Sequence, residues 1–452
     1  MYLTLDNHVT IYQTKGDYNV IVEKVDANER KQFDYFTINK TGKQILESID
    51  GLQQMDEFIQ SFILDNNLVN DDSAWIQEFL IDMLNRGALL LQEEQKLEQP
   101  PLYIYGDSKL ISPLHVTVEI TEKCNLYCAH CYLNASCNKT TAINFHEFEE
   151  LVKKLKANNV LSIEITGGEV FMNRDADKIL ELAFNEFSRV ALLTNGTILK
   201  KSSLELLTKN KDKLAVSISL DSVREDLHDR FRGMRGAFKS TCRNIKRLTE
   251  SGIHVRVASS IFDENMWEVD KLAELAISLG AEMFVYNFVE NFGRGTELNK
   301  NSGPNFSKKY SKYLSETVEK YRYLIPIIES EDYLRSSSNC GAGTNTILIG
   351  ADGNLRPCPI FPKNKIFKNI NDGDMVEIFS NEIYQQISNI YPPSIENGCP
   401  KACPNYSNCF GCYMKGLESN VYRESENYCP WITFNNLESF MEKYKEGKII
   451  EE

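Results

Sequence analysis

Three cysteines, Cys124, Cys128 and Cys131, lie close together in the sequence CNLYCAHC and follow a strand-like apolar run at 115–120. Three thiolates can hold three irons of a four-iron cluster and leave the fourth iron free to bind a small molecule, whereas four cysteines would complete the ligation. Zinc also accepts thiolates, but a structural zinc site needs four ligands, and His130 is too close in sequence to be an easy fourth. The spacing favours an iron-sulfur cluster with an open iron, with zinc as the alternative.

A second segment with chemical potential is Thr166-Gly167-Gly168-Glu169, at the end of the next strand-like run, 161–165. Glycine lets a backbone approach a ligand closely, and a carboxylate accepts strong hydrogen bonds from an ammonium group. An isolated Gly-Gly-Glu would mean little. After the cysteine triplet, it indicates a small-molecule site beside the open iron.

Together the CxxxCxxC triplet and TGGE resemble the radical S-adenosylmethionine (SAM) superfamily. In that family the open iron binds the amino and carboxylate groups of SAM, and an electron from the cluster cleaves SAM to methionine and a 5′-deoxyadenosyl radical. The resemblance implies cluster ligation by the three cysteines, a cofactor-binding role for Gly167 and Gly168, and an ammonium contact for Glu169. It places His130 beside the adenine, where the family more often has Tyr, Phe or Trp. A solvent-facing loop position is the alternative for His130.

The composition is that of an ordinary soluble globular protein, and 452 residues allow two to four domains. No run approaches 18 apolar residues, and Asp6 stands where a signal peptide needs a basic end, so we expect a cytoplasmic protein without a membrane partner. Twelve cysteines without a secretion signal indicate metal ligands or reactive thiols rather than disulfides. The net charge of −14 argues against a nucleic-acid partner.

Residues 1–95 are predicted to form a separate module with a winged-helix-like arrangement. Two strand-like runs, 9–14 and 18–25, are joined through Gly16 and Asp17, which predicts a hairpin. A third strand then leads into a helix cap near Asn39. Helices are expected at about 40–50, 55–65 and 73–91.

The charge of this module argues against DNA as its partner. Residues 1–100 contain eight Lys and Arg against eighteen Asp and Glu, which would repel phosphates. The segment FTINKTGKQILESIDG at 36–51 resembles the PqqD-like element that captures leader peptides of ribosomally made precursors. The resemblance implies that a leader adds as a strand to the edge of the small sheet, beside the third helix. An inert docking domain is the alternative.

After a polar, proline-containing linker at 96–110, residues 111–325 alternate between strand-like and helical segments. The strand-like runs are 115–120, 161–166, 190–194, 215–220, 254–262 and 282–289. Six βα units with right-handed crossovers predict an α/β fold in which a parallel sheet curves into an open (β/α)6 barrel. Ligands of such sheets bind at the carboxyl ends of the strands, where the cysteine triplet and TGGE both lie.

The motifs ITGGE, LLTNGT, SISLDS, HDRFRG, NMWE and FGRG occur in the order found in the subtilosin-type sactisynthases, which make thioether bridges in a precursor peptide. The resemblance covers essentially the whole chain. It implies that Ser219 contacts the ribose or carboxylate of the nucleoside, that Asn195 lines the same pocket, and that Arg232 reaches the carboxylate end. Capping of a strand end is the alternative role for each of the three.

Seven further cysteines follow residue 325, within two strand-like runs across an Asp-Gly turn and a loop-rich stretch. This region resembles the SPASM extension of radical enzymes that act on peptides, and the segment from Gly353 to Cys358 fits the GxxxxC sequence typical of it. We assign the extension to 326–435 and a C-terminal helix to 436–452. Zinc ribbons are the alternative.

Carried over by order, the SPASM resemblance implies two auxiliary four-iron clusters, and so three clusters in the chain. One would be fully ligated, by Cys399, Cys403, Cys409 and Cys429. The other would be held by Cys340, Cys358 and Cys412, and its open iron would take up the substrate cysteine as a thiolate, which makes these three the catalytic candidates. The remaining Cys137 and Cys242 are expected only to pack.

The sequence therefore predicts a radical SAM enzyme that installs cysteine-derived thioether crosslinks in a ribosomally synthesised precursor peptide. An electron donor such as flavodoxin or ferredoxin would serve it. One alternative is a radical enzyme that forms carbon-carbon crosslinks or epimerises residues, with the auxiliary clusters as electron carriers. An alternative of another class is a non-enzymatic, redox-sensing iron-sulfur binding protein.

Overall fold

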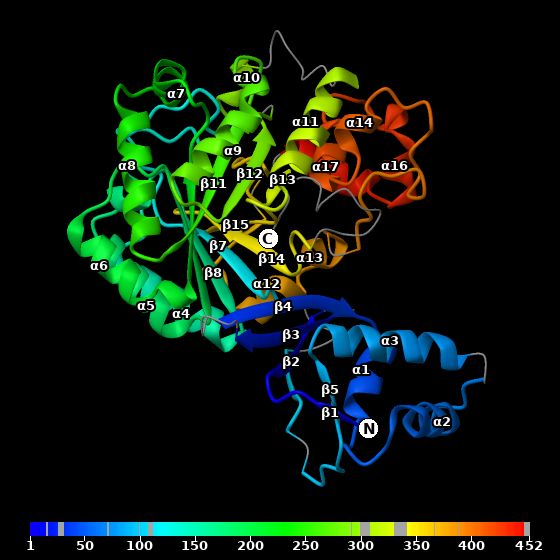
Figure 1. Cartoon of the computed structure of the whole chain (residues 1–452). Helices are drawn as coiled ribbons and strands as arrows, with labels where there is room; N and C mark the ends of the chain where they lie inside the picture. The colour runs from blue at the N-terminus through cyan, green and yellow to red at the C-terminus, as the bar shows by residue number, and fades with distance from the viewer. Residues whose placement is uncertain are drawn as a thin grey trace. The chain divides into compact units, whose positions relative to one another are not determined.

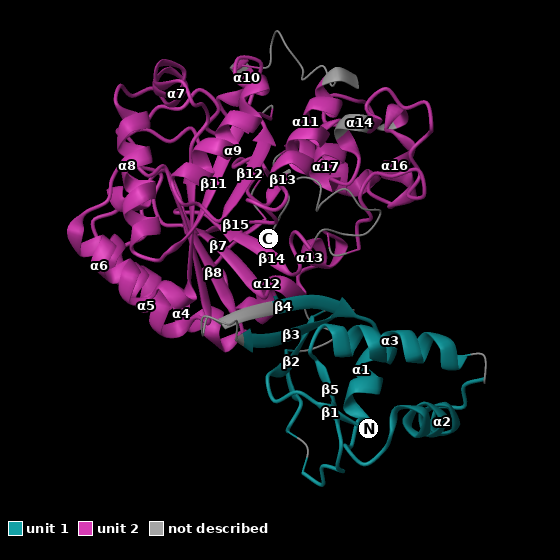
Figure 2. Cartoon of the chain, viewed as in Figure 1, with its two compact units in different colours: residues 1–112 teal, residues 113–452 magenta. Residues whose placement is uncertain are grey.

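The computed structural model describes residues 1–14, 17–25, 31–69, 72–98, 100–106, 112–290, 292–298, 308–329, 341–365, 367–387 and 389–446. Gly16 of the predicted hairpin and Cys340 of the predicted auxiliary cluster lie outside these ranges. The chain divides into two compact units, residues 1–112 and 113–452 (Figure 2).

The first unit contains a four-stranded sheet in the order β4-β3-β2-β6. Strands β2 (Val9–Thr14), β3 (Asp17–Val25) and β4 (Lys31–Ile38) are antiparallel neighbours, so the predicted β2–β3 hairpin is present. Strand β6 (Tyr103–Gly106) pairs in parallel with β2. The segment predicted as a linker at 96–110 therefore supplies an edge strand to this sheet, and the first unit extends beyond residue 95.

Besides β6, two further strands of the first unit were not predicted. Strands β1 (Tyr2–Leu5) and β5 (Leu89–Gln92) form a separate antiparallel pair. The prediction of helix as far as residue 91 is wrong, because α3 ends at Asn85 and Gly87, with φ of +73°, turns the chain out of the helix. The apolar run after the turn then pairs as a strand.

Three helices cover the core of the first unit, as predicted: α1 (Lys40–Glu47), α2 (Met55–Asp65) and α3 (Ser73–Asn85). Asn39 caps α1, because its Oδ1 accepts the Gly42 N–H at 2.8 Å. The buried cluster joins one face of the sheet to all three helices and includes Ile11, Val20, Ile45, Leu46, Phe62 and Leu80.

The six predicted barrel strands are present and pair in parallel in chain order. They are β7 (His115–Glu119), β8 (Ser162–Thr166), β9 (Arg189–Thr194), β10 (Leu214–Ser219), β11 (His254–Ile261) and β12 (Met283–Phe288). A further parallel strand, β13 (Ile327–Glu329), extends the β12 edge. The α/β class and the parallel arrangement are confirmed.

Helices alternate with these strands, and Figure 1 shows α4, α5, α6 and α8 following one another around the outside of the sheet. The helices are α4 (Phe145–Ala157), α5 (Ala176–Glu186), α6 (Lys201–Lys209), α7 (Glu225–Arg232), α8 (Ala237–Glu250), α9 (Val269–Ser278), α10 (Gly295–Leu298) and α11 (Lys308–Tyr321). Along β11, Val255 and Val257 are fully buried while Arg256 and Ala258 line a cavity. One face of the sheet thus packs into the core, and the other lines a hollow interior.

The predicted SPASM hairpin continues the barrel sheet. Strand β14 (Thr346–Ile349) pairs in parallel with β7, β15 (Asn354–Arg356) pairs antiparallel with β14, and β16 (Lys368–Asn369) follows β15. Short helices complete the region: α12 (Met375–Ser380), α13 (Glu382–Ile387), α14 (Tyr406–Cys409), α15 (Tyr413–Glu418), α16 (Pro430–Phe434) and α17 (Glu438–Glu446). Within the described ranges, no helix combines the length and the apolar character needed to cross a bilayer.

Candidate functional site

The predicted cluster cysteines lie on a loop, residues 120–144, that leaves the carboxyl end of β7; we call it the cysteine loop. The loop folds back on itself, with the Cys124 N–H donating to the Ser136 carbonyl at 3.1 Å. Backbone N–H groups of Leu126 and Ala135 donate to the sulfurs of Cys124 and Cys131, each at 3.4 Å. Hydrogen bonds to cysteine sulfur are among the contacts by which proteins tune iron-sulfur clusters.

The three sulfurs converge. Burial above all raises the pKa of Cys124 to about 12, and negative charge on Glu169, Cys128 and Cys131 raises it further. A bound metal removes such thiol protons outright. Among the described residues, no three Cys, His, Asp or Glu side chains are spaced for a single metal ion. Three converging soft thiolates suit three irons of a four-iron cluster.

The TGGE segment lies directly against the base of the cysteine loop. The Gly168 N–H donates to the Thr121 carbonyl at 2.7 Å, and the Glu169 N–H donates to the Lys123 carbonyl at 2.9 Å. A Cβ atom on Gly168 would lie 2.4 Å from the Lys123 carbonyl oxygen. Only glycine permits so close an approach of two backbones, so the paired glycines set the distance between TGGE and the cysteines.

Glu169, the last residue of TGGE, is only 1% exposed. Its Oε1 accepts the Thr194 hydroxyl at 2.8 Å, and its Oε2 accepts the Asn195 N–H at 2.8 Å. Burial raises the pKa of this carboxyl group. Glu169 therefore ties TGGE to the turn after β9, and its contact with the methionyl ammonium remains a prediction.

A cavity of about 360 Å³ opens at the carboxyl ends of the barrel strands; we call it the cofactor cavity. It brings together nearly all of the predicted site residues of the barrel: Cys124, Cys128, His130, Cys131, Gly167, Gly168, Asn195, Ser219 and Arg232. Its lining also includes residues that the sequence analysis did not single out, among them Arg256, Asn287 and Arg294. A cavity of this size suits a drug-sized ligand such as SAM.

The Asn195 side chain is held by local hydrogen bonds. Its Oδ1 accepts from the backbone N–H of Thr197 at 2.9 Å and from the Thr197 hydroxyl at 2.6 Å. Its Nδ2 donates to Asn125 Oδ1 at 3.0 Å and lies 3.8 Å from the Cys124 sulfur. These contacts favour the capping role for Asn195, and they also join the turn after β9 to the cysteine loop.

Arg232 forms a buried ion pair with Asp221 at the wall of the cofactor cavity. Arg232 Nε lies 2.5 Å from Asp221 Oδ2, and Arg232 Nη1 lies 3.7 Å from the Cys128 sulfur. Burial by itself would raise the pKa of Asp221, but the guanidinium outweighs burial and lowers that pKa. The pair therefore holds a positive charge next to a predicted cluster thiolate.

The His130 ring belongs to a stack of three rings. It packs on Phe231 with centroids 4.4 Å apart, and Phe231 packs on Phe262 at 4.1 Å. Its Nδ1 is buried and has no hydrogen-bond partner among the described residues, while the ring lines the cofactor cavity. Burial lowers the pKa of His130 to about 3, so the ring is neutral. The stacking on Phe231 disfavours the solvent-facing alternative.

Arg294, in the FGRG segment, has a position that the sequence analysis did not predict. Its Nε donates to the Cys128 carbonyl at 2.7 Å and its Nη1 to the Ala135 carbonyl at 3.0 Å. The guanidinium also lies 4.0 Å from the centre of the Tyr127 ring. Arg294 thus clamps the cysteine loop at three points. The FGRG motif marked the segment, but only tertiary contacts reveal what the arginine holds.

The described cysteines of the SPASM region fall into two groups. Burial raises the pKa of Cys399 to about 11, and Cys429, Cys403 and Cys409 raise it further through their charge. Cys358 and Cys412 are both neighbours of Tyr444, whose pKa is raised by burial and then by Glu418 and these two thiols. This grouping supports the predicted partition, which stays a prediction because Cys340 lies outside the described residues. Neither group includes Cys137, which is exposed, or Cys242, on α8.

A buried carboxylate joins the cysteine loop to the SPASM region. Glu119, at the end of β7, accepts Arg356 Nη2 at 2.7 Å and the Tyr132 hydroxyl at 3.3 Å. Tyr132 directly follows Cys131, and Arg356 stands two residues before Cys358. The cysteine loop and the segment leading to Cys358 are therefore tied to the same side chain.

Comparison with known proteins agrees with this geometry. Residues 118–276 match the radical SAM superfamily, and residues 340–413 match SPASM, an iron-sulfur cluster-binding domain. The chain is 36% identical to the antilisterial bacteriocin subtilosin biosynthesis protein AlbA of Bacillus subtilis over 414 residues, which cover 91% of each chain. The chain belongs to the radical SAM peptide maturases. As a maturase of this family it is an enzyme that uses SAM and iron-sulfur clusters and modifies a peptide.

Two other known proteins also match most of this radical SAM maturase. It is 27% identical to the sporulation killing factor maturation protein SkfB of Bacillus subtilis, over 74% of this chain and 80% of SkfB. Its fold resembles that of SuiB of Streptococcus suis, solved with the precursor peptide SuiA, with a TM-score of 0.62, 16% identity, and coverage of 92% of this chain and 97% of that one. The family membership sets aside the redox-sensing and zinc alternatives.

Proposed function

We propose that this maturase forms thioether bridges between cysteine sulfur and carbon in a ribosomally synthesised precursor peptide, using three four-iron clusters. The observation that carries the proposal is the pairing of β14 with β7, which places the segment leading to Cys358 beside the strand leading to the cysteine loop. Glu119 ties the two loops together. The relatedness to a subtilosin biosynthesis protein supports the same reaction.

Cys124, Cys128 and Cys131 would hold the four-iron cluster, which together with SAM would supply the radical chemistry that removes a hydrogen atom from the acceptor carbon. Forming the sulfur-carbon bond then releases the thiol proton and one electron, so each bridge costs the peptide two hydrogens. The chain's own residues hold the geometry. TGGE and Arg294 fix the cysteine loop, and Cys340, Cys358 and Cys412 would hold the auxiliary iron that takes the substrate sulfur and the electron.

The nucleoside contacts belong to the same proposal. Ser219 and Arg232 line the cofactor cavity, and we propose that they contact the ribose and carboxylate of SAM. The neutral, stacked His130 ring offers a flat face for the adenine. Glu169 would meet the methionyl ammonium, although it does not line the cavity in this structure; its carboxylate accepts hydrogen bonds from Thr194 and Asn195.

The first unit is proposed to bind the leader of the precursor. Its sheet ends at β4, which pairs only with β3 among the described strands, so one backbone edge is available for strand addition. Its acidic balance favours a leader with basic residues. Flavodoxin or ferredoxin is the proposed electron donor. An inert docking role for the unit is the alternative. Removal of the unit distinguishes the two roles, because only a leader-binding unit is needed for precursor binding.

The reaction is tested by co-expression of the enzyme with candidate small cysteine-containing precursor peptides from the same genome, followed by mass spectrometry. A thioether bridge lowers the mass by two hydrogens and removes one thiol from alkylation. Crosslinking between carbons also removes two hydrogens but leaves every thiol open to alkylation, and epimerisation leaves the mass unchanged. A product that loses two hydrogens and still alkylates at all its cysteines would replace the thioether proposal with the carbon-carbon one.

The role of the auxiliary iron has its own test. Addition of the precursor should perturb the spectrum of an auxiliary cluster if the precursor sulfur binds there, and a precursor with Ser in place of each Cys should not, because a hydroxyl is a poor ligand for a soft site. The same perturbation from both peptides would leave the auxiliary clusters as electron carriers.

A further inference from the structure

A second cavity, of about 290 Å³, adjoins the cofactor cavity; we call it the side pocket. Three loops line it. The cysteine loop contributes Tyr132 and Asn134, the turn before α10 contributes Phe292 and Gly293, and the segment after Cys358 contributes residues 359–364. Tyr132 lines both cavities. Tyr132 is therefore a wall that the side pocket shares with the cavity that would hold SAM.

The position of the side pocket is fixed relative to the cysteine loop. Gly293 has φ of +53°, and a Cβ atom there would lie 2.4 Å from the Cys131 carbonyl oxygen. The next residue, Arg294, donates its backbone N–H to the same carbonyl at 3.1 Å. On the other side, Arg356 holds the start of the segment after Cys358 through the Phe361 carbonyl at 3.2 Å and Glu119 at 2.7 Å. The pocket thus lies between the cysteine loop, which carries the predicted radical cluster, and the segment that follows the predicted auxiliary ligand Cys358.

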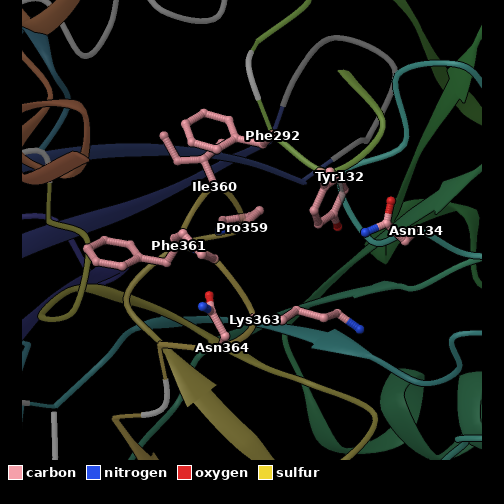
Figure 3. Close-up of a pocket in the computed structure, with 10 residues that line it drawn as sticks. Tyr132, Asn134, Phe292, Pro359, Ile360, Phe361, Lys363 and Asn364 are labelled. Carbon is pink, nitrogen blue, oxygen red and sulfur yellow. The ribbon is translucent and has the colours of Figure 1, made fainter. Parts of the chain in front are cut away.

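The wall of the side pocket is mostly apolar. Figure 3 shows Phe292 and Ile360 near one end, Asn364 and Lys363 at the other, and Tyr132 and Asn134 to one side. The Phe361 ring turns away from the pocket and packs on Phe367 and Tyr413, with centroids 5.3 and 5.7 Å apart. A pocket wall made of an aromatic ring, Phe292, and a branched side chain, Ile360, suits an apolar side chain.

The side pocket carries little net charge. Lys363 is the charged side chain among its lining residues, and its ammonium is paired with Glu122, which Lys139 also approaches at 3.5 Å. A phosphate or a free carboxylate would find no unpaired cation there. Asn134 and Asn364 are exposed at the rim, and each side-chain amide offers both a donor and an acceptor. Such amides suit the backbone of a peptide.

We infer that the side pocket binds the acceptor residue of the precursor, the residue whose carbon receives the cysteine sulfur, and that this residue is apolar and bulky. Its side chain occupies the space between Ile360 and Phe292, and its backbone pairs with Asn134 and Asn364. The inference rests on the proposed function and adds to it the class of acceptor. The occupant is a segment of the precursor because the pocket is neutral, adjoins the cofactor cavity through Tyr132, and begins immediately after Cys358.

The test fills the pocket. Ile360→Trp adds an indole to a lining position, and Val376→Trp adds one at a site that is 44% exposed on α12, outside the pocket. The probe is the cysteine-containing precursor that the enzyme modifies in the co-expression experiment, with its native acceptor or with Ala in that position. Iron content that matches between the two variants shows that Ile360→Trp is folded.

We expect Ile360→Trp to lower the number of bridges formed per 5′-deoxyadenosine at least about tenfold with the native acceptor, and to shift preference toward the Ala acceptor by about the same factor. Val376→Trp should keep both the yield and the preference of the unaltered enzyme. Equal bridge yields and equal preferences in the two variants would overturn the inference. If Ile360→Trp loses iron, Asn364→Ala serves instead, with an expected rise in KM for the precursor, and an unchanged KM would count against the inference.

A photocrosslink separates this inference from the proposed reaction. A precursor with p-benzoylphenylalanine at the acceptor position should label residues 132–134 or 359–364. If the label lands there but the normal product lacks a thioether, the pocket assignment holds and the reaction proposal fails. If thioethers form but the label lands only on the barrel interior around Ser217 and Arg256, the pocket assignment fails and the reaction proposal holds.

Discussion

Gly167 lies so close to Thr121 that a Cβ atom on residue 167 would stand 2.4 Å from the Thr121 carbonyl oxygen. The same glycine has φ of +142°, a conformation that other residues avoid. This contact locks the TGGE segment to the cysteine loop, and therefore the floor of the cofactor cavity to the cluster ligands.

Gly167→Ala should weaken SAM binding at least about tenfold, because the added methyl group must push the two loops apart. Gly236→Ala is the matched control, since Gly236 also has a positive φ, +82°, but nothing lies within 4 Å of its Cβ position. Calorimetric titration of the reconstituted proteins with SAM measures the effect. Equal affinities in the two variants would show that the loop contact does not shape the cavity.

The triple change of Cys124, Cys128 and Cys131 to Ala should remove the iron of one cluster, from about twelve irons per chain to about eight. It should also abolish SAM cleavage, because the auxiliary cysteines bind no SAM in the proposal. Iron analysis after anaerobic reconstitution and chromatography of 5′-deoxyadenosine provide the two readouts. Continued SAM cleavage in this variant would refute the assignment of the radical cluster.

Arg294→Lys should loosen the cysteine loop while preserving the charge. Lysine cannot reproduce the planar fork that reaches the carbonyls of both Cys128 and Ala135. We expect iron to be released to a chelator about 10- to 100-fold faster, the usual range for residues that support metal ligands. Arg322→Lys, at an exposed ion pair with Glu319, is the control and should release iron at the original rate.

The free energy of unfolding should fall in mild acid because of the buried His228. Burial lowers its pKa to about 4, from about 6.5 in an unfolded chain, and its Nδ1 accepts the Asp221 N–H at 3.2 Å. Between these two values the unfolded chain binds a proton that the folded chain does not. The contribution of His228 to the free energy of unfolding is therefore complete above about pH 6.5 and declines as the pH falls toward 4.

The effect is measured by urea unfolding of the original protein and of His228→Asn at pH 7.5 and pH 5.0. Asn keeps an acceptor for the Asp221 N–H and does not titrate in this range. The original protein should lose about 2 kcal/mol more than the variant between the two pH values. Equal losses would mean that His228 takes up its proton in the folded state.

Removal of the first unit, residues 1–112, should weaken precursor binding at least about tenfold and leave SAM cleavage uncoupled from peptide modification. Every assigned cluster ligand and every residue of the cofactor cavity lies beyond residue 112. Fluorescence anisotropy with a labelled leader peptide measures the binding, which for the complete chain should weaken as salt rises because the unit is acidic. Modification of the complete precursor at the original rate by the truncated enzyme would favour the inert docking role.

Much of the fold follows from local patterns. The six barrel strands were predictable because each is a short apolar run that ends in a polar turn, and the helices between them carry clear caps such as Asn144, whose side chain accepts the Glu147 N–H at 3.1 Å. Strands β5 and β6 were not predictable in the same way. The segment LLLQ, after a helix, becomes a strand because it pairs with β1, and YIYG, in a predicted linker, becomes a strand because it pairs with β2. Both partner strands are distant in sequence, so local pattern alone does not reveal the pairing.

The sequence by itself predicted the chemistry of the site, because three closely spaced cysteines, Cys124, Cys128 and Cys131, offer metal-binding thiols, and the glycines of TGGE allow a close backbone approach. Tertiary structure decided how the site is held. Three contacts join residues 104 to 237 positions apart in the chain: Arg294 with the Cys128 carbonyl, Arg232 with the Cys128 sulfur, and Arg356 with Glu119. No local pattern encodes such partners, because a charged side chain reads as solvent-exposed until the packed chain buries it against its counterpart.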